Sequence, residues 1–189
     1  ETVAIPATEQ ALKAAKLSVD DIDFMIFATS TPDYYIPGSG CLLQEKMGFK
    51  EIGALDIRVQ CSGFIYGLSI AEQYIKAGTF ENILLVGAEA QTTAMEMNNN
   101  GRDVSIIFGD GAGAAVVMEG TPSQNVGTKT TSGFLSIRLH SDGRCHDFIK
   151  VPAGGSKFPS NIETVRNDLH AIGLKGGAVY RARVKPISS

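Results

Sequence analysis

The chain has 189 residues, of which 43% are hydrophobic and 20% are charged, and its formal net charge is −3 at pH 7. This composition is typical of a globular protein that buries a core, and the small acidic excess argues against a nucleic-acid-binding protein. No apolar run is long enough to span a membrane and no signal peptide is visible, so we expect neither a membrane protein nor a secreted one.

The three cysteines, Cys41, Cys61 and Cys145, are widely and irregularly spaced. An odd number at such spacing predicts neither a disulfide framework nor a zinc site of the CxxC type. Because free thiols are typical of a reducing compartment, we expect a cytoplasmic protein.

Hydrophobic periodicity predicts alternating helices and strands in the first part of the chain. A helix over residues 2–17 is followed by a strand over 24–28, and residues 30–38 form a loop rich in turn residues. The next helix is short, with Ser39 as its expected cap and Gly48 as its end.

Cys61 lies where an alternating strand changes into a helix. Leu55, Ile57 and Val59 alternate as in a strand, and the apolar period becomes helical over 62–78. At a helix start, unpaired N–H groups and the positive end of the helix dipole favour a thiolate, which makes a good nucleophile. A free cysteine is also commonly a small buried hydrophobic residue, so this segment alone leaves both interpretations open.

Four further strands and one more helix are expected after residue 78. The strands are predicted at 82–87, 104–108, 114–118 and near 133–140, and the helix at 178–184. A tight glycine-rich connection predicts that the second and third of these strands form a hairpin. Helices alternating with apolar strands are typical of an α/β protein with a largely parallel sheet covered on both faces.

Three features could indicate ligands, but each has a simpler explanation. Residues 109–114 match the relaxed dinucleotide fingerprint G-x-G-x-x-A, yet a strand and not the required helix follows, which favours a hairpin or close backbone packing. His140, Cys145 and His146 fit no standard zinc spacing and are expected to form a local turn. Arg102 follows a run of Asn and Gly beside the expected sheet, where it could meet a phosphate or be an ordinary surface arginine.

Several segments, in this order and spacing, together resemble beta-ketoacyl-acyl-carrier-protein synthase III, the condensing enzyme that starts type II fatty acid synthesis. They are 56–64, 86–89, 101–103, 107–115, 139–143 and 176–180. The resemblance extends from residue 1 to about residue 185. It implies a thiolase-like fold, with α-β-α layers around a mixed, largely parallel five-stranded sheet, of which this chain would contain the N-terminal half and the start of the second half.

The resemblance also implies a role for each candidate site residue. Cys61 would be the catalytic nucleophile that takes the acyl group of acyl-coenzyme A as a thioester, with its own N–H in the oxyanion hole. Arg102 and Tyr180 would bind coenzyme A, at its nucleotide end and along its tunnel respectively. Phe108 would form a wall of the acyl pocket, and Ile36 would help to close the pocket of the partner subunit in a homodimer.

The implied reaction needs no separate cofactor and no metal, since acyl-coenzyme A is a substrate. Decarboxylation of malonyl-acyl carrier protein would give a carbanion that attacks the Cys61 thioester. We therefore expect acyl-coenzyme A, malonyl-acyl carrier protein and a second copy of the chain as partners, and neither nucleic acid nor membrane. Gly177 stands where some members of the family have an asparagine, so one polar contact to coenzyme A would differ.

Members of this family complete the site with a His and an Asn from the second half of the fold. The chain begins without Met, and we expect it to be the central portion of a longer enzyme that can be acylated without completing a turnover. Residues 1–142 would form the N-terminal half without its first segment, and 143–189 a linker and the truncated start of the C-terminal half. The alternatives are another thiolase-like ketosynthase III of secondary metabolism and a noncatalytic dimerising remnant.

Overall fold

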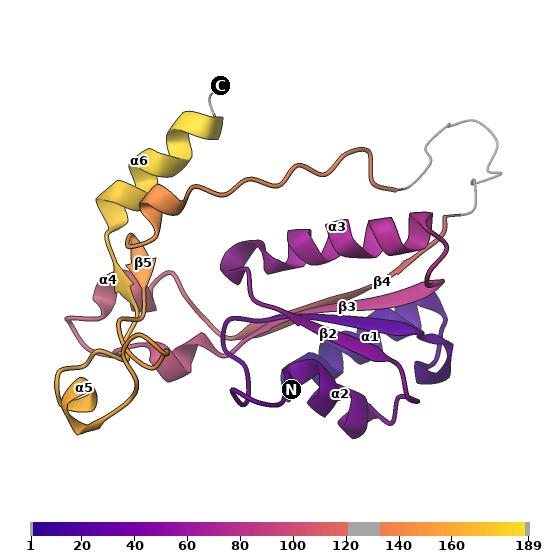
Figure 1. The fold of residues 1–189 in the computed structure, drawn as a ribbon, viewed down its shortest axis with the longest axis horizontal. Helices are drawn as coiled ribbons and strands as arrows, with labels where there is room; N and C mark the ends of the chain where they lie inside the picture. The colour runs from indigo at the N-terminus through magenta and orange to yellow at the C-terminus, as the bar shows by residue number, and fades with distance from the viewer. Residues whose placement is uncertain (1, 121–132, 188–189) are drawn as a thin grey trace. The chain divides into compact units, whose positions relative to one another are not determined.

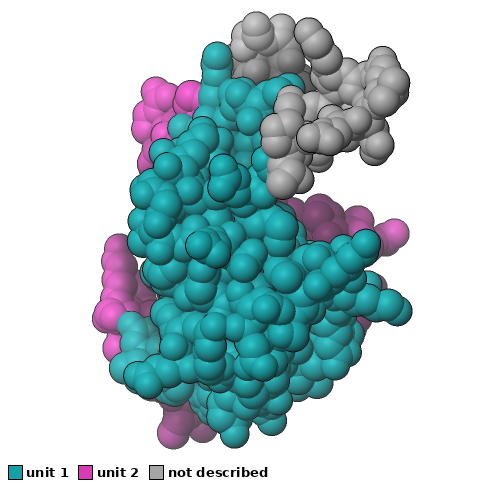
Figure 2. Space-filling model, turned by 90° about the vertical axis from the view of Figure 1, so that its right-hand side faces the viewer, with its two compact units in different colours: residues 1–89, 111–139 teal, residues 90–110, 140–189 magenta. Residues whose placement is uncertain are grey.

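The computed structural model describes residues 2–120 and 133–187. The chain divides into two compact units, which Figure 2 shows in different colours. Unit 1 comprises residues 1–89 and 111–139, and unit 2 comprises residues 90–110 and 140–189. Unit 2 thus combines two separate stretches of the chain, whereas the sequence predicted a single division after residue 142.

Unit 1 is built around a mixed sheet that, in the described residues, has four strands in the order β2-β1-β3-β4. The strands are β1 (Phe24–Ala28), β2 (Gly53–Ile57), β3 (Asn82–Glu89) and β4 (Gly111–Met118). β1 pairs in parallel with both β2 and β3, and β4 is antiparallel to β3. The predicted mixed, largely parallel sheet is confirmed, with four described strands in place of five.

Helices cover both faces of this sheet, as Figure 1 shows. One face carries α1 (Ala4–Ala15) and α2 (Ser39–Met47), and the other carries α3 (Gly63–Lys76). The short 3₁₀ helices η1 (Val19–Asp21) and η2 (Gln60–Ser62) lie in the connections. Unit 1 therefore has the predicted α-β-α layers.

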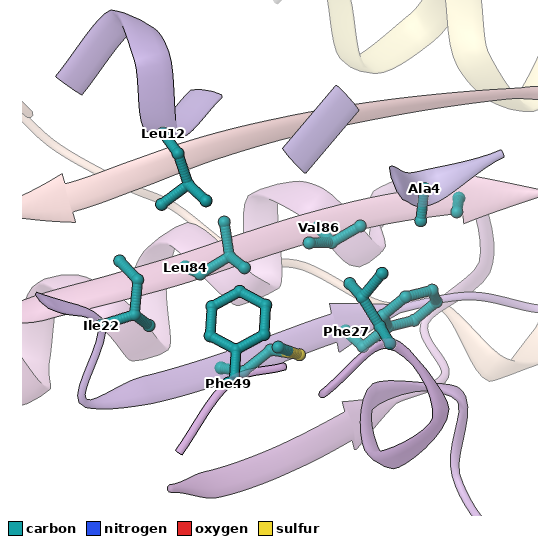
Figure 3. Close-up of a cluster of buried hydrophobic side chains, with 10 residues drawn as sticks. Ala4, Leu12, Ile22, Phe27, Phe49, Leu84 and Val86 are labelled. Atoms are coloured by element: carbon teal, nitrogen blue, oxygen red, sulfur yellow. The ribbon is translucent and has the colours of Figure 1, made fainter. Parts of the chain in front are cut away.

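The core follows directly from the period of two in the strands. On one face, Phe27 of β1 and Leu84 and Val86 of β3 pack with Ala4 and Leu12 of α1 (Figure 3). The intervening strand residues point to the opposite face and pack against α3; they are Ile26, Ile83 and Leu85. Strands buried on both faces read as continuous apolar runs, which is why β1 and β3 were predictable from sequence.

The predicted ends of α2 and α3 are confirmed. Gly48 closes α2 with a left-handed φ of 71°, and Gly78, two residues beyond α3, has a φ of 66°. These values are favourable for glycine because it has no Cβ. The predicted cap is shifted by one residue, since Gly38 occupies the N-cap position and Ser39 is the first residue of α2.

The close approach of α3 to the sheet depends on a small residue at the contact. A Cβ on Gly67 would lie 2.4 Å from Cδ1 of Leu85, so a larger side chain there would displace either the Leu85 side chain or the helix. At the other end of α3, the ring of Tyr74 meets that of Phe24 edge-on at 5.3 Å, and Phe24 stacks on Phe80 at 4.4 Å. These contacts fix the helix that follows Cys61.

Two of the predicted strands are wrong. Residues 102–105 form the short helix α4 (Arg102–Ser105), and the N–H groups of Ile107 and Phe108 donate to the carbonyl of Val104 in a turn. The predicted hairpin is therefore absent, because β4 pairs with β3 over its full length, from Gly111 opposite Glu89 to Met118 opposite Asn82. Residues 133–140 form no strand, since no described neighbour pairs with them.

Unit 2 consists of short elements. They are η3 (Gln91–Ala94), α4, η4 (Gly143–Cys145), β5 (Ile149–Lys150), α5 (Ile162–Arg166), β6 (Gly173–Leu174) and α6 (Gly176–Ile187). β5 and β6 pair antiparallel, and α5 begins with a capping box in which Asn161 and Thr164 exchange hydrogen bonds. The predicted helix over 178–184 is confirmed as part of α6.

Candidate functional site

Cys61 lies in the 3₁₀ turn η2 between β2 and α3, immediately before Ser62, the N-cap residue of α3. Gln60, which precedes it, has a left-handed φ of 46° and turns the chain sharply at this point. The predicted junction of strand and helix is therefore confirmed. Cys61 is exposed, so the alternative of a small buried hydrophobic residue is wrong.

The first turn of α3 packs on the ends of two strands. A Cβ on Gly63 would lie 3.1 Å from Cβ of Ala28, the last residue of β1, and one on Gly87 would lie 3.1 Å from the ring of Phe64. The carboxyl ends of parallel strands meet at one edge of a sheet. Cys61 is therefore presented at this carboxyl edge, next to the N-terminal N–H groups of a 14-residue helix.

This arrangement can support nucleophilic chemistry. An exposed thiol can be reached by a substrate, and N–H groups at a helix N-terminus stabilise negative charge that develops close to them. Cys41, on α2, is exposed as well, but it lies in the third position of its helix rather than before the N-cap. Exposure alone therefore does not distinguish Cys61 from Cys41, whereas its place before α3 does.

Ile36, the other predicted site residue in unit 1, belongs to the loop over residues 30–38. Its side chain is 80% exposed, next to Tyr34 and Tyr35, which are 61% and 82% exposed. Among the described residues, Ile36 is therefore exposed rather than enclosed. Three neighbouring large side chains that are exposed in this way are consistent with a contact to a second subunit.

The remaining predicted site residues lie in unit 2. Arg102 is exposed at the start of α4, Phe108 is half-buried in the turn after it, and Tyr180 on α6 is 71% exposed. Gly101 sets the position of Arg102, because a Cβ there would lie 2.0 Å from the carbonyl oxygen of Glu96. The structure thus holds Cys61 and Ile36 in unit 1 and the other three residues in unit 2.

The glycine-rich segment 109–114 has a structural role that the sequence did not reveal. Gly111, Ala112 and Gly113 belong to β4, but a Cβ on Gly109, Gly111 or Gly113 would meet no described atom within 4 Å, so the interpretation as close backbone packing is wrong for these glycines. The carboxylate of Asp110 accepts hydrogen bonds from the N–H of Thr92 at 2.8 Å and from its hydroxyl at 2.7 Å. Both bonds lower the pKa of Asp110, and the bond from the Thr92 hydroxyl has the larger effect. They also attach η3 to the segment.

Replacing Thr92 by valine is expected to raise the pKa of Asp110 toward its ordinary value of 3.8, because the hydroxyl donor is lost. In the wild type, the lowered pKa means that this interaction stabilises the fold at pH values above the ordinary pKa of 3.8. The contribution disappears as the pH falls through the folded-state pKa. A titration of the carboxyl carbon by NMR measures the shift. Thr93→Val is the matched control, since the Thr93 hydroxyl donates to the carbonyl of Ala90; equal shifts in both variants would contradict the assignment.

The predicted local turn is confirmed for Cys145 and His146, which belong to or directly follow η4, whereas His140 lies outside it. Arg144 donates to both carboxylate oxygens of Asp142 at 2.8 Å, which lowers the pKa of Asp142 to about 2, and Nδ1 of His146 lies 3.2 Å from the carbonyl oxygen of Gly143. Among residues 2–120 and 133–187, no group of three potential ligands gathers as a metal site requires. No helix in the same ranges is long and apolar enough to cross a membrane.

Two carboxylates at the carboxyl edge of the sheet were missed. Glu89 accepts hydrogen bonds from Ser30 and Thr31, and Asp56 accepts them from the N–H groups of Ser39 and Gly40. Both residues stand in the segments that carried the family resemblance, at the end of β3 and near the end of β2. Their spacing in the sequence gave no indication that they would hold the same loop.

The family model for 3-oxoacyl-[acyl-carrier-protein (ACP)] synthase III matches residues 55–143. The beta-ketoacyl-[acyl-carrier-protein] synthase III of Clostridioides difficile is 39% identical over 98% of this chain and 53% of its own length. That of Caldanaerobacter subterraneus is 40% identical over 99% of this chain and 54% of its own length. The crystal structure of 3-oxoacyl-[acyl-carrier-protein] synthase III from Aquifex aeolicus superposes with a TM-score of 0.79 at 31% identity, over 98% of this chain and 53% of that one.

These comparisons support the fold, and the family model covers the segments around Cys61. The sequence match extends over almost the entire chain, while the chain spans about half the length of the curated relatives it matches. The similarity of the solved structure covers the same extent and confirms the thiolase-like α/β fold expected from the resemblance. By sequence and by fold, this chain is similar to the beta-ketoacyl-acyl-carrier-protein synthases III over about half of their length.

Proposed function

We propose that this chain provides the acyl-accepting part of a condensing enzyme that starts fatty acid synthesis. The observation that carries the proposal is the exposed thiol of Cys61 at the carboxyl edge of the sheet, directly before the N-terminus of α3. The similarity to beta-ketoacyl-acyl-carrier-protein synthases III supports the reaction class. Acyl-coenzyme A is the acyl donor, and no separate cofactor takes part.

The first half-reaction is acyl transfer to Cys61. The thiolate sulfur attacks the carbonyl carbon of the acyl thioester, and the carbonyl oxygen takes up negative charge. The N–H of Cys61 and the first N–H groups of α3 stabilise this oxyanion. The bond to the coenzyme A sulfur then breaks, coenzyme A leaves as a thiolate that takes up a proton, and the acyl group remains on Cys61 as a thioester.

The second half-reaction is the condensation. Malonyl-acyl carrier protein loses carbon dioxide, and the resulting carbanion attacks the Cys61 thioester to give a beta-ketoacyl product and free Cys61. The family resemblance assigns this step to a His and an Asn of the second half of the fold. We therefore propose that these 189 residues undergo acylation and that turnover needs the complete enzyme.

The other candidate residues select and hold the acyl donor. Arg102 is an exposed cation that suits the phosphates of coenzyme A, and the exposed ring of Tyr180 offers a surface for the rest of the carrier. Phe108 contributes to the wall of the acyl pocket. Ile36, 80% exposed at the tip of its loop, closes the pocket of a second subunit, so we propose a homodimer. The free cysteines of the chain suit a reducing compartment, and we propose that the protein is cytoplasmic.

We also propose that the two halves of the fold meet near residue 142. Residues 1–142 contain the complete β1–β4 sheet and correspond to the N-terminal half. Residues 143–189 supply a linker and the start of the C-terminal half. The exposed apolar side chains of Ile162 and Val165 on α5, 69% and 61% exposed, are consistent with an element that is covered in a longer protein.

The test is incubation of the chain with acetyl-coenzyme A, followed by measurement of released coenzyme A thiol and of the intact mass. The proposal predicts one acetyl group on the protein for each coenzyme A released. A folded chain that releases no coenzyme A and gains no mass would instead support a noncatalytic dimerising protein. A primer preference for acyl groups foreign to fatty acid synthesis would favour a ketosynthase III of secondary metabolism.

A further inference from the structure

The loop over residues 30–38 is attached at its beginning to β3. Ala28 of β1 pairs with Gly87 of β3, so that two residues further on Ser30 lies beside Glu89 at the carboxyl edge of the sheet. Oε1 of Glu89 accepts the N–H of Ser30 at 2.9 Å, and Oε2 accepts the hydroxyls of Ser30 and Thr31 at 2.8 and 2.9 Å. Hydrogen bonds to a carboxylate are among the strong ones, so Glu89 fixes the start of the loop.

The end of the same loop is attached to β2. The carboxylate of Asp56 accepts the N–H groups of Ser39 at 2.6 Å and Gly40 at 3.0 Å, the first residues of α2. A Cβ on Gly38 would lie 2.6 Å from this carboxylate, and one on Gly40 would lie 2.8 Å from it. A side chain at either position would therefore displace the Asp56 carboxylate, which fixes where the loop enters α2.

Between these two attachments, the tip of the loop carries three exposed hydrophobic side chains. Tyr34, Tyr35 and Ile36 are 61%, 82% and 80% exposed. The N–H of Asp33 donates to the hydroxyl of Ser39 at 3.2 Å, which shortens the free part of the loop further. The position of the tip therefore depends on two carboxylates that belong to neither the loop nor α2.

We propose that Glu89 and Asp56 are positioning residues that fix this loop and thereby set which acyl chains the Cys61 site accepts. The proposal rests on the proposed function, in which Ile36 closes an acyl pocket. Neither carboxylate needs to touch the substrate. Each acts through the loop, because a displacement of about 1 Å in a group that positions a substrate can change a rate by about two orders of magnitude.

The experiment compares the rates at which acetyl-coenzyme A and octanoyl-coenzyme A acylate Cys61 in the full chain. For Glu89→Ala we expect the ratio of the two rates to change by about tenfold or more. Glu89→Gln should keep the ratio within about threefold of the wild type, because its amide can accept the Ser30 N–H and donate to the two hydroxyls. Thr31→Val removes one of the three bonds and should shift the ratio in the same direction by less.

The matched control is Glu81→Ala, at an exposed glutamate directly before β3, which should leave the ratio unchanged. The rate of alkylation of Cys61 by iodoacetamide should be the same in all variants, because this reagent does not use the acyl pocket. An unchanged ratio in both Glu89→Ala and Thr31→Val, with Ile36→Ala shifting it, would overturn the positioning role while leaving the proposed function intact. A wild-type chain that is not acylated at all would overturn both.

Discussion

Replacement of Cys61 by alanine is expected to abolish acylation of the chain by acyl-coenzyme A. The acyl group then has no acceptor, because the proposed step forms its only new covalent bond at the Cys61 sulfur. Intact mass spectrometry after incubation with acetyl-coenzyme A measures the result as the absence of the acetylated species. The expected effect is a complete loss rather than a reduced rate.

The controls are Cys41→Ala and Cys145→Ala. Cys41 is exposed to solvent, as Cys61 is, and Cys145 is half-buried. Neither of the two control residues directly precedes the N-terminus of a long helix. Both control variants should be acetylated at the wild-type rate. Retention of acetylation in Cys61→Ala, or its loss in Cys41→Ala, would show that exposure and not the position before α3 determines the reactive thiol.

Replacement of Phe27 by alanine is expected to lower the free energy of unfolding by about 3–5 kcal/mol. Phe27, on β1, is 2% exposed and packs with residues of β3 and α1 in the core that Figure 3 shows. Its removal therefore leaves a cavity that the neighbouring side chains cannot fill. Urea denaturation followed by circular dichroism measures the change. A loss of this size is a large fraction of the stability of an ordinary domain.

Phe134→Ala is the matched control, since Phe134 belongs to the same unit and is 42% exposed. We expect this variant to lose about 1 kcal/mol or less. Similar losses in the two variants would contradict the assignment of Phe27 to the core on the α1 face of the sheet. A loss confined to Phe27→Ala supports it.

The elements that were predicted correctly are those whose burial determines their period. β1 and β3 are buried on both faces and appear as continuous apolar runs, while α1 and α3 each bury one stripe. The segment 104–108 has the same apolar character as a strand, yet β3 already pairs over its full length with β4. The competition for a partner strand is not visible in a local pattern, and the segment folds as a helical turn instead.

In the candidate site, too, local features were predictable from the sequence and long-range contacts were not. Cys61 was found because the apolar period changes beside it, which is a local signal. The bonds from Ser30 to Glu89 join residues 59 positions apart, and those from Ser39 to Asp56 join residues 17 positions apart. No local pattern predicts such contacts, so the two attachments of the loop emerged only from the fold.

The most direct test of this account is to map the acyl group after the chain has reacted with acyl-coenzyme A. Proteolysis followed by tandem mass spectrometry locates the added mass among the peptides that contain Cys41, Cys61 and Cys145. The account predicts a thioester on Cys61 and unmodified thiols at the other two positions. An acyl group on Cys41 or Cys145, or no acyl group on a folded chain, would contradict it.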